Sequence, residues 1–306
     1  MRLKIMKGFV NIQGKILPIH QAVIPVLDHG FLYGDSVYET FRTCHGTPLQ
    51  FEEHIDRLFY SAQRLELKMP FPKEKILQET LNTALHYWKK TKKEDLYIRV
   101  IVSRGYGDIG FDPKLCPHPL LIIIVKPFIP FPQIYYKTGV KLTFVSIVRN
   151  HPKSIDPNIK SGNYLNNILA YLEAKKQGSS IFDALMCNAD GYITEGTTSN
   201  IFIIKKGKLY TPSLESGILR GLTREFIIRL AKNNHLNVQE TKISKAMLLS
   251  SDECFLASSL KGILPVTYCK TQTLRKIGSG KPGPMTQKLM SLFDHAITKT
   301  CASSSS

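Results

Sequence analysis

The sequence contains a lysine and a glutamate whose types and spacing suit chemistry on an aldehyde. Lys160 lies in the run IKSGNYLNN (residues 159–167), and Glu195 follows in the run ITEGTTSN (residues 193–200). A lysine amine forms a Schiff base with an aldehyde once its neutral form is populated. A carboxylate that keeps a pyridine nitrogen protonated makes the ring an electron sink. The pair therefore fits pyridoxal 5'-phosphate, with Glu195 at the pyridine nitrogen.

Several ordered motifs carry a resemblance to a known family. They are DHGFLYGD (residues 28–35), EHIDRL (residues 53–58), the lysine run, the glutamate run and GILRGLTR (residues 217–224). On these motifs nearly the whole chain resembles the fold-type IV pyridoxal-phosphate enzymes, the class-IV aminotransferase family. The resemblance implies a two-domain α+β and α/β architecture, with a small α+β N-terminal domain and a larger C-terminal pseudo-barrel domain. It also implies a homodimer or higher homo-oligomer, with active sites near a dimer interface.

The resemblance assigns roles to individual residues. Lys160 would be the catalytic residue that binds the cofactor and moves a proton from the substrate Cα. Leu222 and Thr223 open an expected helix, whose free N–H groups and dipole favour a phosphate. The other residues implied to bind the cofactor are Arg57, Tyr164, Ser258 and Ser259. Those implied to bind the substrate carboxylate are Tyr33, Tyr38, Tyr97 and Arg99.

Some of these residues also have purely structural interpretations. Arg57 could be a solvated arginine on a helix, and Tyr164 could belong to a helix core. Arg99 stands in an apolar strand, where an unpaired guanidinium would be expensive to bury. It therefore faces either a pocket or a structural salt bridge, with Glu39 as the candidate partner.

Composition limits the class of protein. With 306 residues and 43% hydrophobic residues, the chain can bury a substantial core. The longest apolar run, residues 120–125, is far too short to span a bilayer, and the amino terminus lacks the apolar region of a signal peptide. We expect a cytoplasmic protein with no membrane partner. The six cysteines are scattered without a C-x-x-C pair, so neither a metal site nor a disulfide framework is expected.

The net charge of +17 would assist the capture of anionic phosphate and carboxylate ligands. A basic nucleic-acid-binding protein is the alternative from a different class. Because the lysines are spread along the chain with no basic and aromatic stripe, we expect a solvated lysine-rich surface and no nucleic-acid partner.

Periodicity and proline positions predict the organisation of the chain. We expect a small α+β domain at residues 1–128, a proline-rich linker at 129–136, a large cofactor-binding domain at 137–300 and a disordered tail at 301–306. Expected strands include a hairpin at residues 9–16 and strands at 22–27, 96–103, 120–126 and 140–148. Expected helices lie at residues 51–65, 73–88, 222–231, 244–249 and 285–296. A further helix from Tyr164 would have the apolar face Leu165, Ile168, Leu169 and Leu172.

The resemblance divides over the reaction. The extent of the match favours a branched-chain-type aminotransferase that exchanges an amino group between an amino acid and 2-oxoglutarate. Thr40 and Leu260, in YETFR and SSLKG, look more like aminodeoxychorismate lyases, which make 4-aminobenzoate and pyruvate. A D-amino-acid aminotransferase is a third alternative. In each case the partners are a small amino acid and a 2-oxo acid or a related small substrate.

Overall fold

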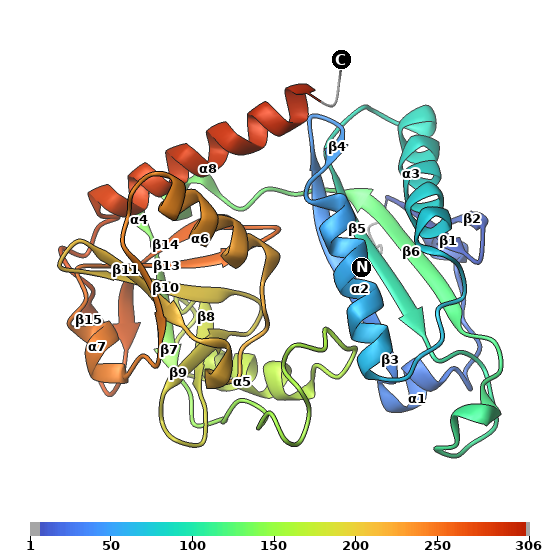
Figure 1. Cartoon of the computed structure of the whole chain (residues 1–306), viewed down its shortest axis with the longest axis horizontal. Helices are drawn as coiled ribbons and strands as arrows, with labels where there is room; N and C mark the ends of the chain where they lie inside the picture. The colour runs from blue at the N-terminus through green and yellow to red at the C-terminus, as the bar shows by residue number, and fades with distance from the viewer. Residues whose placement is uncertain (1–6, 304–306) are drawn as a thin grey trace. The chain divides into compact units, whose positions relative to one another are not determined.

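The computed structural model describes residues 7–303, and the chain divides into two compact units (Figure 1). Unit 1 comprises Met1–Ile129, Ile159–Asn163 and Thr300–Ser306, and unit 2 comprises Pro130–Asn158 and Tyr164–Lys299. The change from one unit to the other after Ile129 falls within the proline-rich linker expected from the sequence. The segment Ile159–Asn163, which we expected in the larger domain, belongs to unit 1.

Unit 1 is built on a six-stranded sheet in the order β2-β1-β6-β5-β3-β4, with every neighbouring pair antiparallel. The strands are β1 (Phe9–Ile12), β2 (Lys15–Pro18), β3 (Ser36–Cys44), β4 (Thr47–Pro48), β5 (Leu96–Ser103) and β6 (Leu120–Pro127). The expected hairpin near Gly14 is confirmed as β1 and β2. Side chains alternate between the two faces of a strand, so each strand of this sheet presents one set to the helices and one set away from them.

Two long helices, α2 (Phe51–Arg64) and α3 (Lys73–Lys90), supply the apolar side chains that pack on one face of this sheet. Ile55 and Leu58 of α2 lie in one buried cluster with Val37 and Phe41 of β3. The helical spacing read from the sequence therefore marks the buried side of α2. Three short helices, η1 (Ile19–Gln21), α1 (His29–Tyr33) and η2 (Pro113–Leu115), complete the unit.

The prediction of a strand at residues 22–27 is wrong. The segment is a loop, in which Val23 is 80% exposed and Val26 is 70% exposed. Its β-branched residues favour a strand, but Pro25 cannot donate to a sheet and the segment pairs with no other strand along its length.

Unit 2 contains a nine-stranded mixed sheet in the order β12-β11-β10-β13-β14-β7-β8-β9, with β15 also paired to β14. The strands are β7 (Val140–Phe144), β8 (Asp183–Cys187), β9 (Ile193–Gly196), β10 (Asn200–Lys205), β11 (Lys208–Pro212), β12 (Val238–Thr241), β13 (Glu253–Ser258), β14 (Gly262–Lys270) and β15 (Leu274–Lys276). Strand β7 is shorter than the strand expected at residues 140–148. The predicted two-domain α+β class is confirmed.

The helices of unit 2 are α4 (Gln133–Thr138), α5 (Leu165–Lys176), η3 (Leu214–Ser216), α6 (Leu222–Asn233), α7 (Lys245–Leu249) and α8 (Pro284–Ser303), whose last residues from Thr300 belong to unit 1. Leu289 and Phe293 of α8 lie in a buried cluster with Ile227 of α6 and Phe255 of β13. Helix α8 runs past the expected start of the disordered tail, and Cys301 is only 2% exposed. The rest of that tail, residues 304–306, lies outside the described residues.

The helix expected after Tyr164 is present as α5, but its predicted buried face is exposed. Leu165 is 64% exposed and Leu172 is 50% exposed, whereas small and polar side chains form the buried side. Asn167, Ala170 and Ala174 follow one another at helical spacing and pack this side against the unit. The expected apolar face is therefore present and lies on the exposed side of α5.

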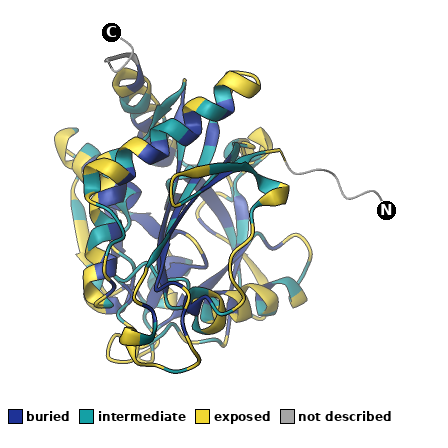
Figure 2. Cartoon of the chain, turned by 90° about the vertical axis from the view of Figure 1, so that its right-hand side faces the viewer, coloured by how far each residue is buried: buried dark blue, intermediate teal, exposed yellow. Residues whose placement is uncertain are grey.

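Figure 2 shows the strands largely buried and the helices with more exposed outer faces. Among residues 7–303, no helix has both the length and the apolar character needed to span a bilayer.

Candidate active site

The segment that carries Lys160 lies beside the start of β3 in unit 1. Ser161 forms an antiparallel bridge with Val37, and the Tyr38 N–H donates to the Lys160 carbonyl oxygen at 2.9 Å. Gly162 sits so close to β3 that a Cβ atom there would collide with the Ser36 hydroxyl. The Gly162 N–H donates to the Ser36 carbonyl oxygen at 2.7 Å, so the segment runs close along β3, and a side chain at residue 162 would force the Ser36 hydroxyl to move.

The Lys160 amine is held against a tyrosine. Its Nζ lies 3.4 Å from the Tyr38 hydroxyl and 4.6 Å from the centre of the Tyr38 ring. The Lys160 N–H donates to the Ser61 hydroxyl on α2 at 3.1 Å. Because Tyr38 is buried, both ends of the lysine are positioned by rigid elements.

Arg99, like Lys160, lies close to the ring of Tyr38. Its guanidinium carbon lies 3.7 Å from the ring centre, and Arg99 is directly opposite Thr40 in the β3/β5 register. Among the described residues, the Thr40 hydroxyl oxygen is a buried atom without a hydrogen-bond partner. Tyr97 points to the same face of β5 as Arg99, and the Lys126 amine lies 4.8 Å from its ring.

Glu39 points to the face of β3 opposite to that of Tyr38 and Thr40. It pairs with residues other than Arg99. Arg57 Nε donates to Glu39 Oε1 at 2.7 Å, and Arg57 Nη2 donates to Oε2 at 2.9 Å. His54 Nδ1 lies 2.6 Å from the same Oε2 atom. The suggested Arg99–Glu39 bridge is therefore wrong, because neighbouring residues of a strand point to opposite faces. Arg57 is only 11% exposed, so it is not a solvated arginine either.

This buried cluster shifts two pKa values. Burial by itself would raise the pKa of Glu39, but the charge of Arg57 and the hydrogen bonds from Arg57 and His54 hold that pKa well below its usual range. Burial lowers the pKa of His54, although the Glu39 charge opposes the shift. The cluster is thus best described as an ionised Glu39 and Arg57 pair, with a neutral His54 donating a third hydrogen bond.

Tyr33 lies at the end of α1, next to the loop that follows β5. Its ring packs against His29 and Phe111, with ring centres 5.0 Å and 5.2 Å away. The Gly110 N–H donates to the Tyr33 hydroxyl at 3.3 Å. Phe111 is 88% exposed, so this tyrosine belongs to an open apolar edge of unit 1.

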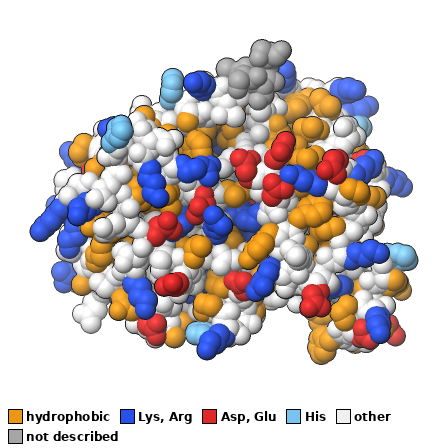
Figure 3. Space-filling view, in the orientation of Figure 1, with side chains coloured by type: hydrophobic (Ala, Val, Ile, Leu, Met, Phe, Trp, Pro, Cys, Tyr) orange, Lys and Arg blue, Asp and Glu red, His pale blue; other side chains and the backbone are white. Residues whose placement is uncertain are grey.

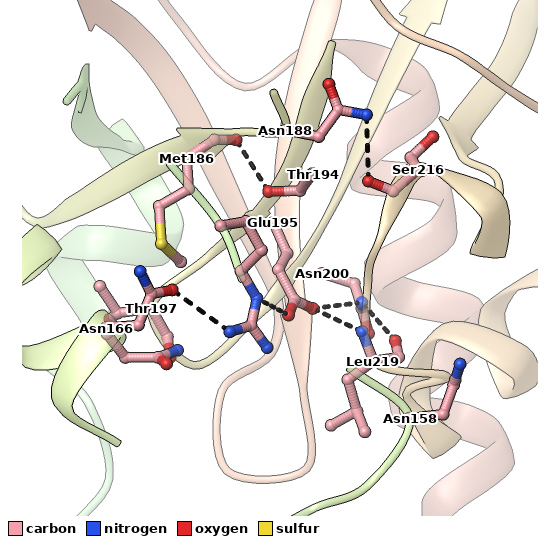
Figure 4. A network of polar contacts seen from close by, with 12 residues as sticks. Asn158, Asn166, Met186, Asn188, Thr194, Glu195, Thr197, Asn200, Ser216 and Leu219 are labelled. Atoms are coloured by element: carbon pink, nitrogen blue, oxygen red, sulfur yellow. Dashed lines mark hydrogen bonds and ion pairs between the residues drawn. The ribbon is translucent and has the colours of Figure 1, made fainter. Parts of the chain in front are cut away.

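Glu195 lies in β9 of unit 2, and donors surround its carboxylate (Figure 4). Arg149 Nε donates to Oε1 at 3.1 Å. Oε2 accepts from the Asn200 side-chain amide and from the Leu219 N–H, both at 3.2 Å. With only 6% of Glu195 exposed, these charged and neutral donors offset the cost of burying a carboxylate.

The chain leads directly from Glu195's partner Leu219 to the start of α6. Gly221 is the N-cap of α6, and no side chain caps the helix. A Cβ atom at Gly221 would collide with the Asn200 side chain, so a larger residue would force Asn200, which donates to Glu195, to move. The Thr223 hydroxyl lies 3.4 Å from the Ser259 hydroxyl, which places two hydroxyls at the α6 N-terminus. A helix end of this kind favours an anion such as phosphate.

Leu222, the remaining predicted residue at this helix start, is the first residue of α6. Ser258 ends β13, and its hydroxyl accepts from the Lys261 N–H at 3.4 Å. Tyr164 precedes α5 and is half-buried, so it is not part of a helix core.

The predicted residues thus fall into one group in each unit. The unit 1 group contains Tyr33, Tyr38, Arg57, Tyr97, Arg99 and Lys160, and the unit 2 group contains Tyr164, Glu195, Leu222, Thr223, Ser258 and Ser259. Sequence reasoning missed His54 and Arg149, which contact the two buried carboxylates. His54 lies within the EHIDRL motif and Arg149 lies in none of the motifs. Neither contact could be read from the sequence, because in each case the partner lies in a different element.

The fold and these residues define a class of enzyme. The sequence model described as Amino-transferase class IV matches residues 36–269, which is most of the chain. The chain belongs to the class IV aminotransferase family and is a transaminase of that class.

Three similar proteins refine this picture. A putative branched-chain-amino-acid aminotransferase of Methanocaldococcus jannaschii is 36% identical and is aligned over 96% of this chain and 97% of that protein. An aminodeoxychorismate lyase of Bacillus subtilis is 34% identical over 84% of this chain and 85% of its own. The T.th. branched-chain amino acid aminotransferase, solved with N-(5'-phosphopyridoxyl)-L-glutamate, has a TM-score of 0.86 and 27% identity, and the match covers 97% of this chain and 96% of that one.

Proposed function

We propose that this enzyme binds pyridoxal phosphate and exchanges an amino group between a branched-chain amino acid and 2-oxoglutarate. The observation that carries the proposal is the Lys160 amine held on the Tyr38 hydroxyl, in a chain that aligns almost end to end with a branched-chain aminotransferase. The similar structure that contains a phosphopyridoxyl-glutamate adduct supports both the cofactor and the glutamate partner.

The donor set fits this cofactor. Bound pyridoxal phosphate supplies an aldehyde and an electron-accepting ring. Lys160 would hold the aldehyde carbon, and the buried Glu195 carboxylate would hold the pyridine nitrogen. The uncapped N-terminus of α6, with Thr223 and Ser259, would bind the phosphate, and Arg57 would add a positive charge to it. The following residues would complete the cofactor contacts: Tyr164 at the phenolic oxygen, and Leu222 and Ser258 at the phosphate.

The remaining residues act on the substrate. Arg99, supported by Tyr38 and Tyr97, would bind the substrate carboxylate, because a guanidinium on an otherwise apolar strand face offers a strong, directed charge. Tyr33 would contact the substrate from the end of α1. The Lys160 amine, positioned by Tyr38, would take the proton from the substrate Cα and return it during the transfer.

Thr40 favours aminodeoxychorismate lyase as the second candidate. Its buried hydroxyl without a partner in the described chain would hydrogen-bond a polar substrate group, which an aliphatic side chain does not offer. Leu260, which follows the phosphate-side serines, is the second lyase-like residue, and the Bacillus subtilis lyase is among the similar proteins.

Two measurements test the function. Purified wild-type protein should take up pyridoxal phosphate and turn yellow, and Lys160→Ala should not, whereas Lys153→Ala, an exposed lysine in the same loop, should behave as wild type. The loaded enzyme is then given leucine with 2-oxoglutarate, D-alanine with 2-oxoglutarate, or aminodeoxychorismate. Glutamate from leucine supports the proposal, glutamate from D-alanine alone points to a D-amino-acid enzyme, and pyruvate with 4-aminobenzoate identifies a lyase. A wild type that stays colourless contradicts the cofactor.

We propose that the enzyme is a homodimer or a higher homo-oligomer, and the exposed stripe of α5 supports this. Leu165, Ile168, Leu169 and Leu172 are 44–64% exposed, and residues 165–172 contain no charge. Two copies that each carry a net charge of +17 repel one another least where their surfaces are uncharged. Leu169→Glu should lower the mass measured by light scattering, whereas Leu85→Glu, at an exposed leucine of α3, should not.

We place the enzyme in the cytoplasm, with no membrane or nucleic-acid partner. All six cysteines are free thiols, which suits a reducing compartment. Figure 3 shows lysines and arginines dispersed among acidic side chains on the face in view, rather than gathered in one basic stripe. Retention on a nucleic-acid column at moderate salt by the cofactor-loaded protein would contradict this view.

A further inference from the structure

Arg149 contacts Glu195, the carboxylate proposed to bind the pyridine nitrogen of the cofactor. The proposed function gives Arg149 no role. It follows β7, and its N–H donates to the Cys187 carbonyl oxygen at 2.9 Å. Its Nε lies 3.1 Å from Glu195 Oε1, and its Nη1 lies 3.4 Å from the Asn166 side-chain oxygen. The Arg149 side chain is 11% exposed and the Glu195 side chain is 7% exposed.

Hydrogen bonding alone does not explain a cation at this position. Oε2 of Glu195 accepts hydrogen bonds from the neutral donors of Asn200 and Leu219. A neutral donor could serve Oε1 in the same way. A guanidinium in so buried a place loses most of its hydration, which destabilises the fold unless its charge is compensated. What Arg149 adds over a neutral donor is a positive charge, which lowers the proton affinity of the carboxylate.

We propose that Arg149 is a positioning residue that fixes Glu195 and keeps a shared proton on the ring nitrogen of bound pyridoxal phosphate. This inference rests on the proposed cofactor. A carboxylate and a pyridine nitrogen compete for one proton, and only the protonated nitrogen makes the ring a strong electron acceptor. By lowering the proton affinity of Glu195, Arg149 assigns the proton to the ring.

The competition has a spectroscopic consequence. A protonated ring nitrogen lowers the proton affinity of the nitrogen that joins Lys160 to the cofactor, because both charges share one conjugated system. Removal of Arg149 should therefore raise the pH at which the visible absorption of the bound cofactor changes. The lost arginine charge itself acts in the same direction.

The experiment is a pH titration of that absorption in holoenzymes made with pyridoxal phosphate. Arg149→Met should raise the midpoint by about one pH unit or more, which is about 1.4 kcal/mol, and should speed cofactor loss on dialysis. Arg149→Lys, which keeps the charge, should recover at least half of the midpoint shift. Arg229→Met, at an exposed arginine of α6, should match wild type in both measurements.

Asn166→Ala provides a second test in case Arg149→Met does not fold. It leaves Arg149 in place but removes the oxygen that accepts from Nη1, so the midpoint should rise by less than in Arg149→Met. If Arg149→Met folds, is coloured and has the same titration midpoint as wild type, the inference is overturned and the cofactor assignment stays intact. If Arg149→Met fails to fold, a wild-type midpoint and dialysis rate in Asn166→Ala overturn it. A colourless wild type instead removes the proposed function.

Discussion

Replacement of Glu39 by glutamine tests the buried cluster that positions Arg57. The carboxylate is fully buried, and Arg57 donates two hydrogen bonds to it at 2.7 and 2.9 Å. Glu39→Gln leaves the Arg57 guanidinium in the same place without its counter-charge. Removing one partner of a buried ion pair costs about 3–5 kcal/mol. Because glutamine keeps one acceptor oxygen, we expect a loss near the lower end, about 3 kcal/mol.

Urea unfolding followed by tryptophan fluorescence can measure this loss within unit 1. Trp88 is the single tryptophan of the sequence and lies on α3, in the same unit as Glu39. The control is Glu53→Gln, which removes an exposed charge from α2 and should change stability by less than about 0.5 kcal/mol. A loss below about 1 kcal/mol in Glu39→Gln, typical of surface pairs, would refute the reasoning.

The same variant should alter the response to acid. The pKa of Glu39 is held below the ordinary value of 4.5, so the folded chain binds fewer protons than the unfolded chain as pH falls. Stability from Glu39 is therefore complete above about pH 4.5 and is lost as pH falls towards the folded pKa. Wild type should lose stability more steeply than Glu39→Gln in that acidic window, and parallel curves would contradict the assignment.

Three further predictions concern single side chains. Thr223→Val should weaken pyridoxal phosphate binding about tenfold by equilibrium dialysis, because it removes a hydroxyl donor to a charged phosphate. Arg99→Met should raise KM for the amino acid roughly 10- to 100-fold without changing the cofactor spectrum, and an unchanged KM would remove Arg99 from the substrate site. Burial raises the pKa of Asp183, so its contribution to stability is lost as pH rises from the unfolded value of 3.8 through the folded pKa. Asp183→Asn should therefore flatten the decline in melting temperature over that range.

The candidate site residues could be proposed from the sequence because most of them lie in short local motifs. Gly162 lies two residues after Lys160, at a position where a side chain would force the Ser36 hydroxyl to move. Glu195 precedes the turn that leads to Asn200, and the start of α6 follows a glycine. These signals are local, since one or two neighbouring residues determine each backbone path.

What the sequence could not predict depends on contacts between distant elements. The apolar spacing of α5 is compatible with a buried or an exposed stripe, and the choice is made by Ala170 and Ala174, whose small side chains allow close packing on the other side. The sequence suggested Arg99 as the partner of Glu39, whereas the structure pairs Glu39 with Arg57. The alternation of β3 decides between them, and it depends on which face of the sheet α2 covers.

The two arginines that contact Glu39 and Glu195 follow one physical rule. Each unit buries one candidate-site glutamate, Glu39 in unit 1 and Glu195 in unit 2, and each glutamate has an arginine within 3.1 Å. A buried carboxylate without a cation would take up a proton or destabilise the fold by several kcal/mol. Under the proposals above, both arginines would also act on the cofactor, Arg57 as a phosphate ligand and Arg149 through the proton affinity of Glu195. The same side chains would then compensate a buried charge and tune the site. The motifs contain Arg57 but not Arg149, which is identified by its contact with a buried carboxylate.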